Sequence, residues 1–157
     1  MPNSASPLSP ATPAPDFSGP IQDGSTRSLA DYRGKRLALY FYPKDMTPGC
    51  TAQACNLTEN FDALADAGIS ILGVSPDPVA KHVKFTDKHG LRIELLADED
   101  LAVHKAFGVW GLKKFMGREY EGTHRTTFLI NKDGVIDHVI SKPKTKDHAA
   151  EILALWK

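Results

Sequence analysis

Apolar and polar positions follow one another along the chain in a pattern that predicts alternating strands and helices. Nearly continuous apolar runs, typical of strands covered on both faces, occupy residues 37–42, 69–74 and 93–97. Residues 51–67 place apolar side chains three and four positions apart, which predicts a helix with one buried face. The other predicted helices run from the proline-containing turn at 75–78 to residue 89, over 98–107 and over 147–156, and the other strands cover 26–29, 126–130 and 135–140.

The order of these elements predicts an α/β fold in which helices flank a central mixed β-sheet. A thioredoxin-like arrangement fits this order. Residues 108–123 hold several glycines among aromatic and basic residues, and we expect them to form a long ordered loop. Residues 1–15 are rich in Ser, Pro and Ala and lack apolar periodicity, so we expect a disordered or extended arm before one domain at 16–157.

Composition and charge narrow the possible functions. Lys and Arg together number 19, as do Asp and Glu, so the formal net charge is zero and nothing suggests a nucleic-acid partner. No apolar run approaches the roughly 20 residues that span a bilayer. The arm has neither the basic start and apolar core of a signal peptide nor the arginines of a transit peptide, so we expect a cytoplasmic protein.

The two cysteines of the chain lie close together at a predicted helix start. Thr47 is a suitable N-cap residue and Pro48 suits the first helical position, which places Cys50 in the first turn. Free backbone N–H groups and the positive end of the helix dipole stabilise a thiolate there. The sequence therefore makes Cys50 a candidate nucleophile and Cys55 its candidate partner.

The spacing of the two cysteines limits how they can react with each other. In an intact helix their Cα atoms lie at least about 7.5 Å apart along the axis, and their side chains point roughly 140° apart. A disulfide rarely spans more than about 7 Å between Cα atoms. If Cys50 and Cys55 bond, the first turns of the helix must therefore unwind, and Pro48, Gly49 and Thr51 make that end comparatively easy to open.

Three further residues complete a candidate site. The Thr47 hydroxyl can point toward the sulfur, and Pro43 would shield the sulfur from bulk water. Arg125 precedes a buried-looking strand and is the best candidate for a cation beside Cys50. The site has no evident metal ligands and no phosphate-binding loop, so a small oxidant fits it better than a large polar substrate.

The remaining histidines do not have the spacing of metal ligands. We expect solvated positions for them; they are His82, His89, His104, His138 and His148. The same expectation holds for the Lys113–Lys114 pair.

Three stretches of the sequence resemble the peroxiredoxin family. Pro43-Lys-Asp-Met-Thr47-Pro-Gly-Cys50 matches its active-site pattern of Pro, three residues, Thr, two residues and Cys. The longer run to Cys55 looks like the peroxiredoxin Q group, also called bacterioferritin comigratory protein. Two later stretches, at residues 108–117 and 124–130, support this resemblance, which extends from about Asp16 to the C-terminus.

The resemblance implies a thioredoxin-like fold and a thiol peroxidase that reduces hydrogen peroxide and organic hydroperoxides. It makes Cys50 the peroxidatic cysteine, which becomes a sulfenic acid, and Cys55 the resolving cysteine of an intramolecular disulfide. Thr47 and Arg125 match the residues that hold the peroxide. Thioredoxin or a similar dithiol would be the reductant, no metal or other cofactor is implied, and we expect a monomer.

Gln53 stands where many peroxiredoxins have Glu, so we expect an amide or another partner to anchor Arg125.

Other interpretations of the same residues remain open. Cys50 and Cys55 could be buried small apolar side chains, or Cys55 could face a thiol of another molecule. Thr47 could be a helix cap only, and Arg125 a surface ion-pair residue. The whole chain could be a general thiol–disulfide oxidoreductase or redox sensor, although the cysteines lack Cys-x-x-Cys spacing, or a non-enzymatic α/β binding module.

Overall fold

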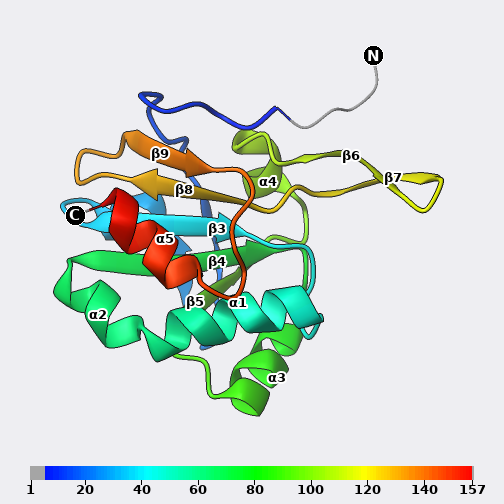
Figure 1. Ribbon diagram of the computed structural model, residues 1–157, viewed down its shortest axis with the longest axis horizontal. Coiled ribbons are helices and arrows are strands. Elements are labelled where there is room, and N and C mark those ends of the chain that lie inside the picture. Colours follow the sequence, from blue (N-terminus) through cyan, green and yellow to red (C-terminus); the bar gives the residue numbers. More distant parts are fainter. Residues whose placement is uncertain (1–5, 157) are drawn as a thin grey trace.

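A mixed β-sheet lies at the centre of the computed structural model, which describes residues 6–156 (Figure 1). Within these residues the sheet has five strands in the order β5 (Glu94–Ala97), β4 (Ile69–Ser75), β3 (Arg36–Phe41), β8 (Thr126–Ile130) and β9 (Ile136–Ile140). The strands β5, β4 and β3 are parallel, whereas β8 runs antiparallel to both β3 and β9. The predicted mixed sheet with flanking helices is confirmed.

Side chains of β3 alternate between two hydrophobic clusters, one on each face of the sheet. Ala38, Tyr40 and, just beyond the strand, Tyr42 belong to the first cluster, and Leu37 and Leu39 belong to the second. All five are at most 1% exposed. An apolar residue is therefore needed at every position, which explains the unbroken apolar run in the sequence.

Helices cover both faces of this sheet. The first face carries α1 (Pro48–Glu59), α2 (Phe61–Asp66), α3 (Val79–His89) and α5 (His148–Leu155), with α5 lying across the strands in Figure 1. The second face carries a 3₁₀ turn, η1 (Leu29–Tyr32), and the short helix α4 (Ala102–Ala106). The active-site motif thus leaves the central strand β3 and enters the helix packed directly against the first face.

Two predicted helices are shorter than their sequence pattern suggested. The helix predicted over 51–67 divides at Asn60, whose side-chain Nδ2 donates to the Asn56 carbonyl at 2.9 Å. Such a side-chain bond to the preceding turn competes with the regular backbone pattern. The helix predicted over 98–107 begins only after Leu101, which has a left-handed backbone with φ of 64°.

The prediction of a long loop over 108–123 was wrong. This segment forms a β-hairpin of β6 (Trp110–Phe115) and β7 (Arg118–Thr123), which projects from the body of the molecule in Figure 1. Met116 and Gly117, with φ of 50° and 79°, make the two-residue turn that matches strand twist. Charged residues occupy much of both strands, so no apolar alternation indicated them.

The N-terminal segment lies against the sheet. Ala11 and Ala14 donate backbone hydrogen bonds to the carbonyls of Ile136 and Gly134 at 2.7 and 2.8 Å. A Cβ atom at Gly108 would lie 2.1 Å from the Ser6 carbonyl oxygen, so this close approach requires glycine. Further on, β1 (Ser18–Pro20) and β2 (Thr26–Ser28) form a hairpin, of which β2 is the strand predicted over 26–29. The division of the chain at residue 15 stays a prediction.

Candidate functional site

The candidate site forms at one end of the antiparallel strand pair β3 and β8 in the middle of the sheet. Phe41, the last residue of β3, pairs with Thr126, the first residue of β8. The segment that follows Phe41 and the residue that precedes Thr126 therefore leave the sheet side by side. This register brings the Cys50 helix next to Arg125, although 75 positions separate the two residues along the chain.

Cys50 lies in the first turn of α1 and is 1% exposed. Thr47, with extended backbone angles, is the N-cap, and Pro48 follows at the start of the helix. The first regular backbone bond of the helix runs from Thr51 N to Thr47 O at 2.8 Å. The N–H groups of Gly49 and Cys50 precede it and therefore have no partner within the helix. Their partial positive charge favours an anionic sulfur.

Arg125 contacts the sulfur directly. Its Nη2 donates to Cys50 Sγ at 3.2 Å, and its Nη1 donates to Gln53 Oε1 at 2.7 Å. The amide of Gln53 therefore anchors the guanidinium where many peroxiredoxins use a carboxylate. Because an amide carries no charge, the positive charge of Arg125 remains available to the sulfur.

Cys55 lies in the same helix and is not bonded to Cys50. An unbroken helix between them keeps the two thiols too far apart for a disulfide, as the spacing predicted. Burial raises the pKa of the Cys55 thiol, and the negative charge of Glu59 raises it further. In this conformation Cys55 is thus a poor nucleophile compared with a thiolate held by a guanidinium.

Thr47 and Pro43 occupy the same loop as predicted, but neither makes a hydrogen bond to the sulfur. Thr47 Oγ1 donates to the Lys44 carbonyl at 2.9 Å and does not cap the helix with its side chain. Pro43 lines a shallow pocket of about 310 Å³ with Trp110 and Lys113. The roles of both residues toward a substrate stay predictions.

Two residues near the sulfur were not found from the sequence. Burial raises the pKa of Tyr40 well above its ordinary value, and the charge of Cys50 adds to this effect. The buried Tyr40 hydroxyl has no hydrogen-bond partner among the described residues. Burial also lowers the pKa of Lys113, which donates to the Thr123 carbonyl at 2.9 Å instead of being fully solvated. The alternation of side chains along β3 could have revealed Tyr40, since Tyr40 and Tyr42 point to the same face of the sheet.

The prediction of solvated positions was wrong for three histidines. His82, His104 and His148 are each 0% exposed. His82 Nδ1 contacts Asp45 Oδ2 at 2.6 Å, and His104 Nδ1 contacts Asp98 Oδ2 at the same distance. None of the described residues forms a group of three or more His, Cys, Asp or Glu side chains that could hold a metal ion.

The chain matches known proteins over most of its length. Residues 10–139 match the model of the AhpC/TSA family. Peroxiredoxin Bcp of Escherichia coli (strain K12) is 50% identical over 147 residues, which cover 94% of each chain. Peroxiredoxin Bcp of Bacillus subtilis (strain 168) is 48% identical over 144 residues, which cover 92% of each. In the part of the chain that the structure describes, no helix has the length and apolar character of a membrane span.

Solved structures with the same arrangement include two bacterial proteins. Peroxidoxin BcpB from Mycobacterium tuberculosis has a TM-score of 0.83 at 33% identity and covers 95% of this chain and 96% of its own. The bacterioferritin comigratory protein of Xanthomonas campestris, whose structures concern alkyl peroxide reduction, has a TM-score of 0.84 at 34% identity. It covers 96% of each chain.

Proposed function

Because the chain belongs to the AhpC/TSA family and is a thiol-dependent peroxidase, we propose that Cys50 is the sulfur that attacks the peroxide. The observation that carries this proposal is the 3.2 Å contact from Arg125 Nη2 to Cys50 Sγ at the amino end of α1. A cation and a helix dipole both favour the thiolate, which is the reactive form. Cys55 has neither the guanidinium contact nor a place in the first turn of the helix, so we assign the two thiols different roles.

The first step transfers one oxygen atom to the sulfur. The Cys50 thiolate attacks the nearer oxygen of the peroxide, an S–O bond forms, and the O–O bond breaks. The electron pair of that bond leaves on the far oxygen, which takes a proton and departs as water or an alcohol. Arg125 stabilises the charge on the oxygens as it develops, and the Thr47 hydroxyl turns from the Lys44 carbonyl to the peroxide.

The second step joins the two cysteines. The Cys55 sulfur attacks the Cys50 sulfenic acid, a disulfide forms, and the hydroxyl leaves as water. For this the helix start unwinds, which breaks the bonds from Arg125 to Cys50 and Gln53 and from Thr51 N to Thr47 O. Opening also exposes Cys55, which removes the burial that raises its pKa.

Unwinding predicts a change in hydrogen exchange. In the reduced protein, amides of residues 51–56 are protected by the helix; in the disulfide form they exchange at least about tenfold faster, because their backbone bonds are lost. Mass spectrometry of peptic fragments measures this, with the amides of α3 as an internal control that does not change. Equal protection of 51–56 in both forms would contradict an opening step.

A Cys55→Ser variant tests the division of roles in stopped-flow mixing of reduced protein with hydrogen peroxide. We expect the first reaction to stay within about twofold of wild type, since the Cys50 surroundings are intact, whereas disulfide formation is lost. Mass spectrometry then finds a product one oxygen heavier, followed by heavier overoxidised forms. Recycling of this variant by thioredoxin at the wild-type rate would refute the resolving role.

Slow reaction of wild type with peroxide, together with rapid exchange with protein disulfides, would favour a general oxidoreductase.

The reductant, the oligomeric state and the location follow from the same proposal. A disulfide inside one chain needs a dithiol to reduce it, so we propose thioredoxin or a similar protein as its reductant. All reacting groups lie in one chain, which is compatible with a monomer. We place the protein in the cytoplasm, where such dithiol reductants maintain free thiols.

A further inference from the structure

The loop between β3 and α1 is fixed to the protein interior at Asp45. Its Oδ1 accepts a hydrogen bond from Tyr42 Oη at 2.6 Å, and its Oδ2 lies 2.6 Å from His82 Nδ1. The Asp45 backbone N–H donates to Asp77 Oδ2 at 2.7 Å. Asp45 is 4% exposed and His82 is 0% exposed, so these bonds are shielded from water. Asp45 is therefore attached on three sides, to Tyr42 just after β3, to α3 and to the turn before α3.

His82 contacts polar groups through both of its ring nitrogens. Its Nδ1 faces the Asp45 carboxylate, and its Nε2 faces the Leu96 carbonyl at 3.2 Å. The ring therefore links the loop that leads to Cys50 with α3, at a site closed to water.

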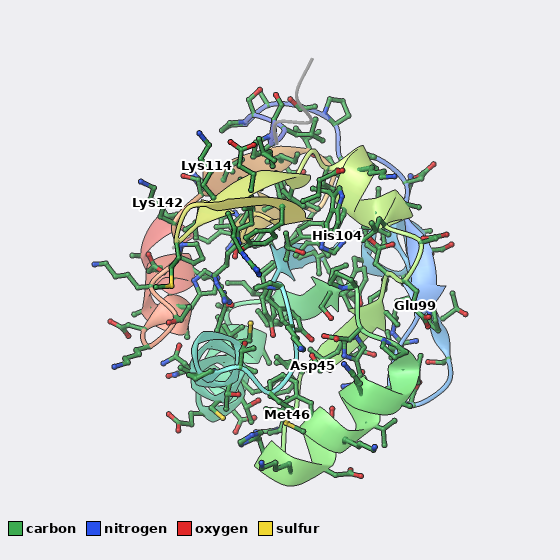
Figure 2. The ribbon with its side chains drawn as sticks, turned by 90° about the vertical axis from the view of Figure 1, so that its right-hand side faces the viewer. Asp45, Met46, Glu99, His104, Lys114 and Lys142 are labelled. Atoms are coloured by element: carbon green, nitrogen blue, oxygen red, sulfur yellow. The ribbon has the colours of Figure 1, made fainter. Side chains whose placement is uncertain are left out.

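Attachment ends abruptly after Asp45. Met46 is 41% exposed and has a left-handed backbone with φ of 69°, which residues other than glycine seldom adopt. Thr47 makes no side-chain cap to α1, and Pro48 is exposed. In Figure 2, Asp45 and Met46 lie at the junction between α1 and α3. The chain thus passes from a buried to an exposed position between two consecutive residues.

A second attachment lies just beyond Cys55. Asn56 Nδ2 donates to the Lys146 carbonyl at 3.1 Å, and Asn56 Oδ1 accepts from Ala149 N at 2.8 Å. Lys146 lies just before α5, and Ala149 lies in its first turn. The two cysteines therefore lie between one attachment at Asp45 and another at Asn56.

We propose that Asp45 and His82 are positioning residues that set the upstream limit of the segment which opens during catalysis. This inference rests on the proposed function, because it concerns the opening that brings Cys50 to Cys55. Residues 46–49 connect the attached Asp45 to Cys50. Five residue steps span at most about 17 Å when extended, so Cys50 can leave the helix while Asp45 stays in place.

The attachment controls how readily the segment opens. A fixed end reduces the conformational freedom of the open state more than that of the helix, which is already ordered. Loss of the Asp45–His82 contact therefore raises the open population, and with it the rate at which Cys55 reaches the sulfenic acid. The reaction with peroxide takes place in the helical state, which remains the major one, so its rate changes little.

The test compares His82→Gln with a matched control, His104→Gln. The terminal amide of glutamine corresponds to the Nε2 end of the imidazole, so the contact from Nδ1 to Asp45 is lost. His104 is equally buried, has the same 2.6 Å bond to an aspartate, and lies on α4, where its ring packs on Phe41 from the second face of the sheet. We expect His82→Gln to speed conversion of sulfenic acid to disulfide at least roughly threefold and to speed amide exchange at 51–54 similarly. The reaction with peroxide stays within about twofold.

Two outcomes would overturn the inference. One is an unchanged or slower disulfide step in His82→Gln, and the other is an equal acceleration in His104→Gln, which would indicate general loosening. Asp45→Asn provides a second variant, and it should behave as His82→Gln does. Absence of a Cys50–Cys55 disulfide in the wild-type protein would instead refute the proposed function, so the two failures are distinguishable.

Discussion

Replacing Cys50 by serine abolishes the reaction with hydrogen peroxide, with a rate at least about a thousandfold below wild type. A serine hydroxyl is not ionised beside Arg125 at neutral pH, and the remaining groups of the site stabilise charge without supplying a nucleophile. Stopped-flow measurement of peroxide consumption by the reduced variant gives this rate directly.

Serine nearly preserves the shape of cysteine, so the loss is expected without unfolding. Circular dichroism and amide exchange of the core strands check this. Cys55→Ser is the matched control, because it removes a thiol from the same helix and keeps the first reaction. A Cys50→Ser variant that still consumes peroxide at a comparable rate would move the nucleophile elsewhere.

Replacing Arg125 by alanine slows attack on peroxide by about 10²- to 10³-fold, the usual effect of removing one donor from a site of developing charge. The change removes the 3.2 Å contact to Cys50 Sγ and leaves the buried Gln53 Oε1 without its donor. The second-order rate constant with hydrogen peroxide, measured at several peroxide concentrations, reports the effect.

Arg118→Ala is the control for this change. Arg118 is exposed on β7, so its loss removes the same charge from the chain without affecting the sulfur. Arg125→Lys should recover only part of the rate, since lysine keeps the charge but cannot bond Cys50 and Gln53 at once. A rate for Arg125→Ala equal to that of Arg118→Ala would exclude a role in the peroxide step.

The parts of the fold that depend on local patterns were predictable from the sequence. The buried strand β3 and the helix start at Pro48 follow from an apolar run and from a Thr-Pro-Gly turn. Arg125 was found because it precedes a second apolar run, and the antiparallel register of β3 and β8 then places it beside Cys50. In each case one short stretch carries the whole signal.

The features that depend on distant partners were not predictable in this way. The hairpin β6–β7 is charged along much of its length and projects into solvent, so burial imposes no apolar period on it. His82 and Asp45 are 37 positions apart, and neither has a local pattern that indicates burial. A polar side chain becomes a core residue only when its partner is also placed, and the partner is invisible to local periodicity.

The N-terminal segment also has a consequence for the sheet as a whole. An open sheet presents unpaired N–H and C=O groups along its two outer strands, and these can pair with another chain. Here Pro13 forms a bridge with Val135 beside β9, and Ile21 forms one with Leu96 of β5. Proline lacks the N–H that would extend the ladder outward. The first part of the chain thus covers part of each border of the sheet and limits the edge that is open to pairing with another chain.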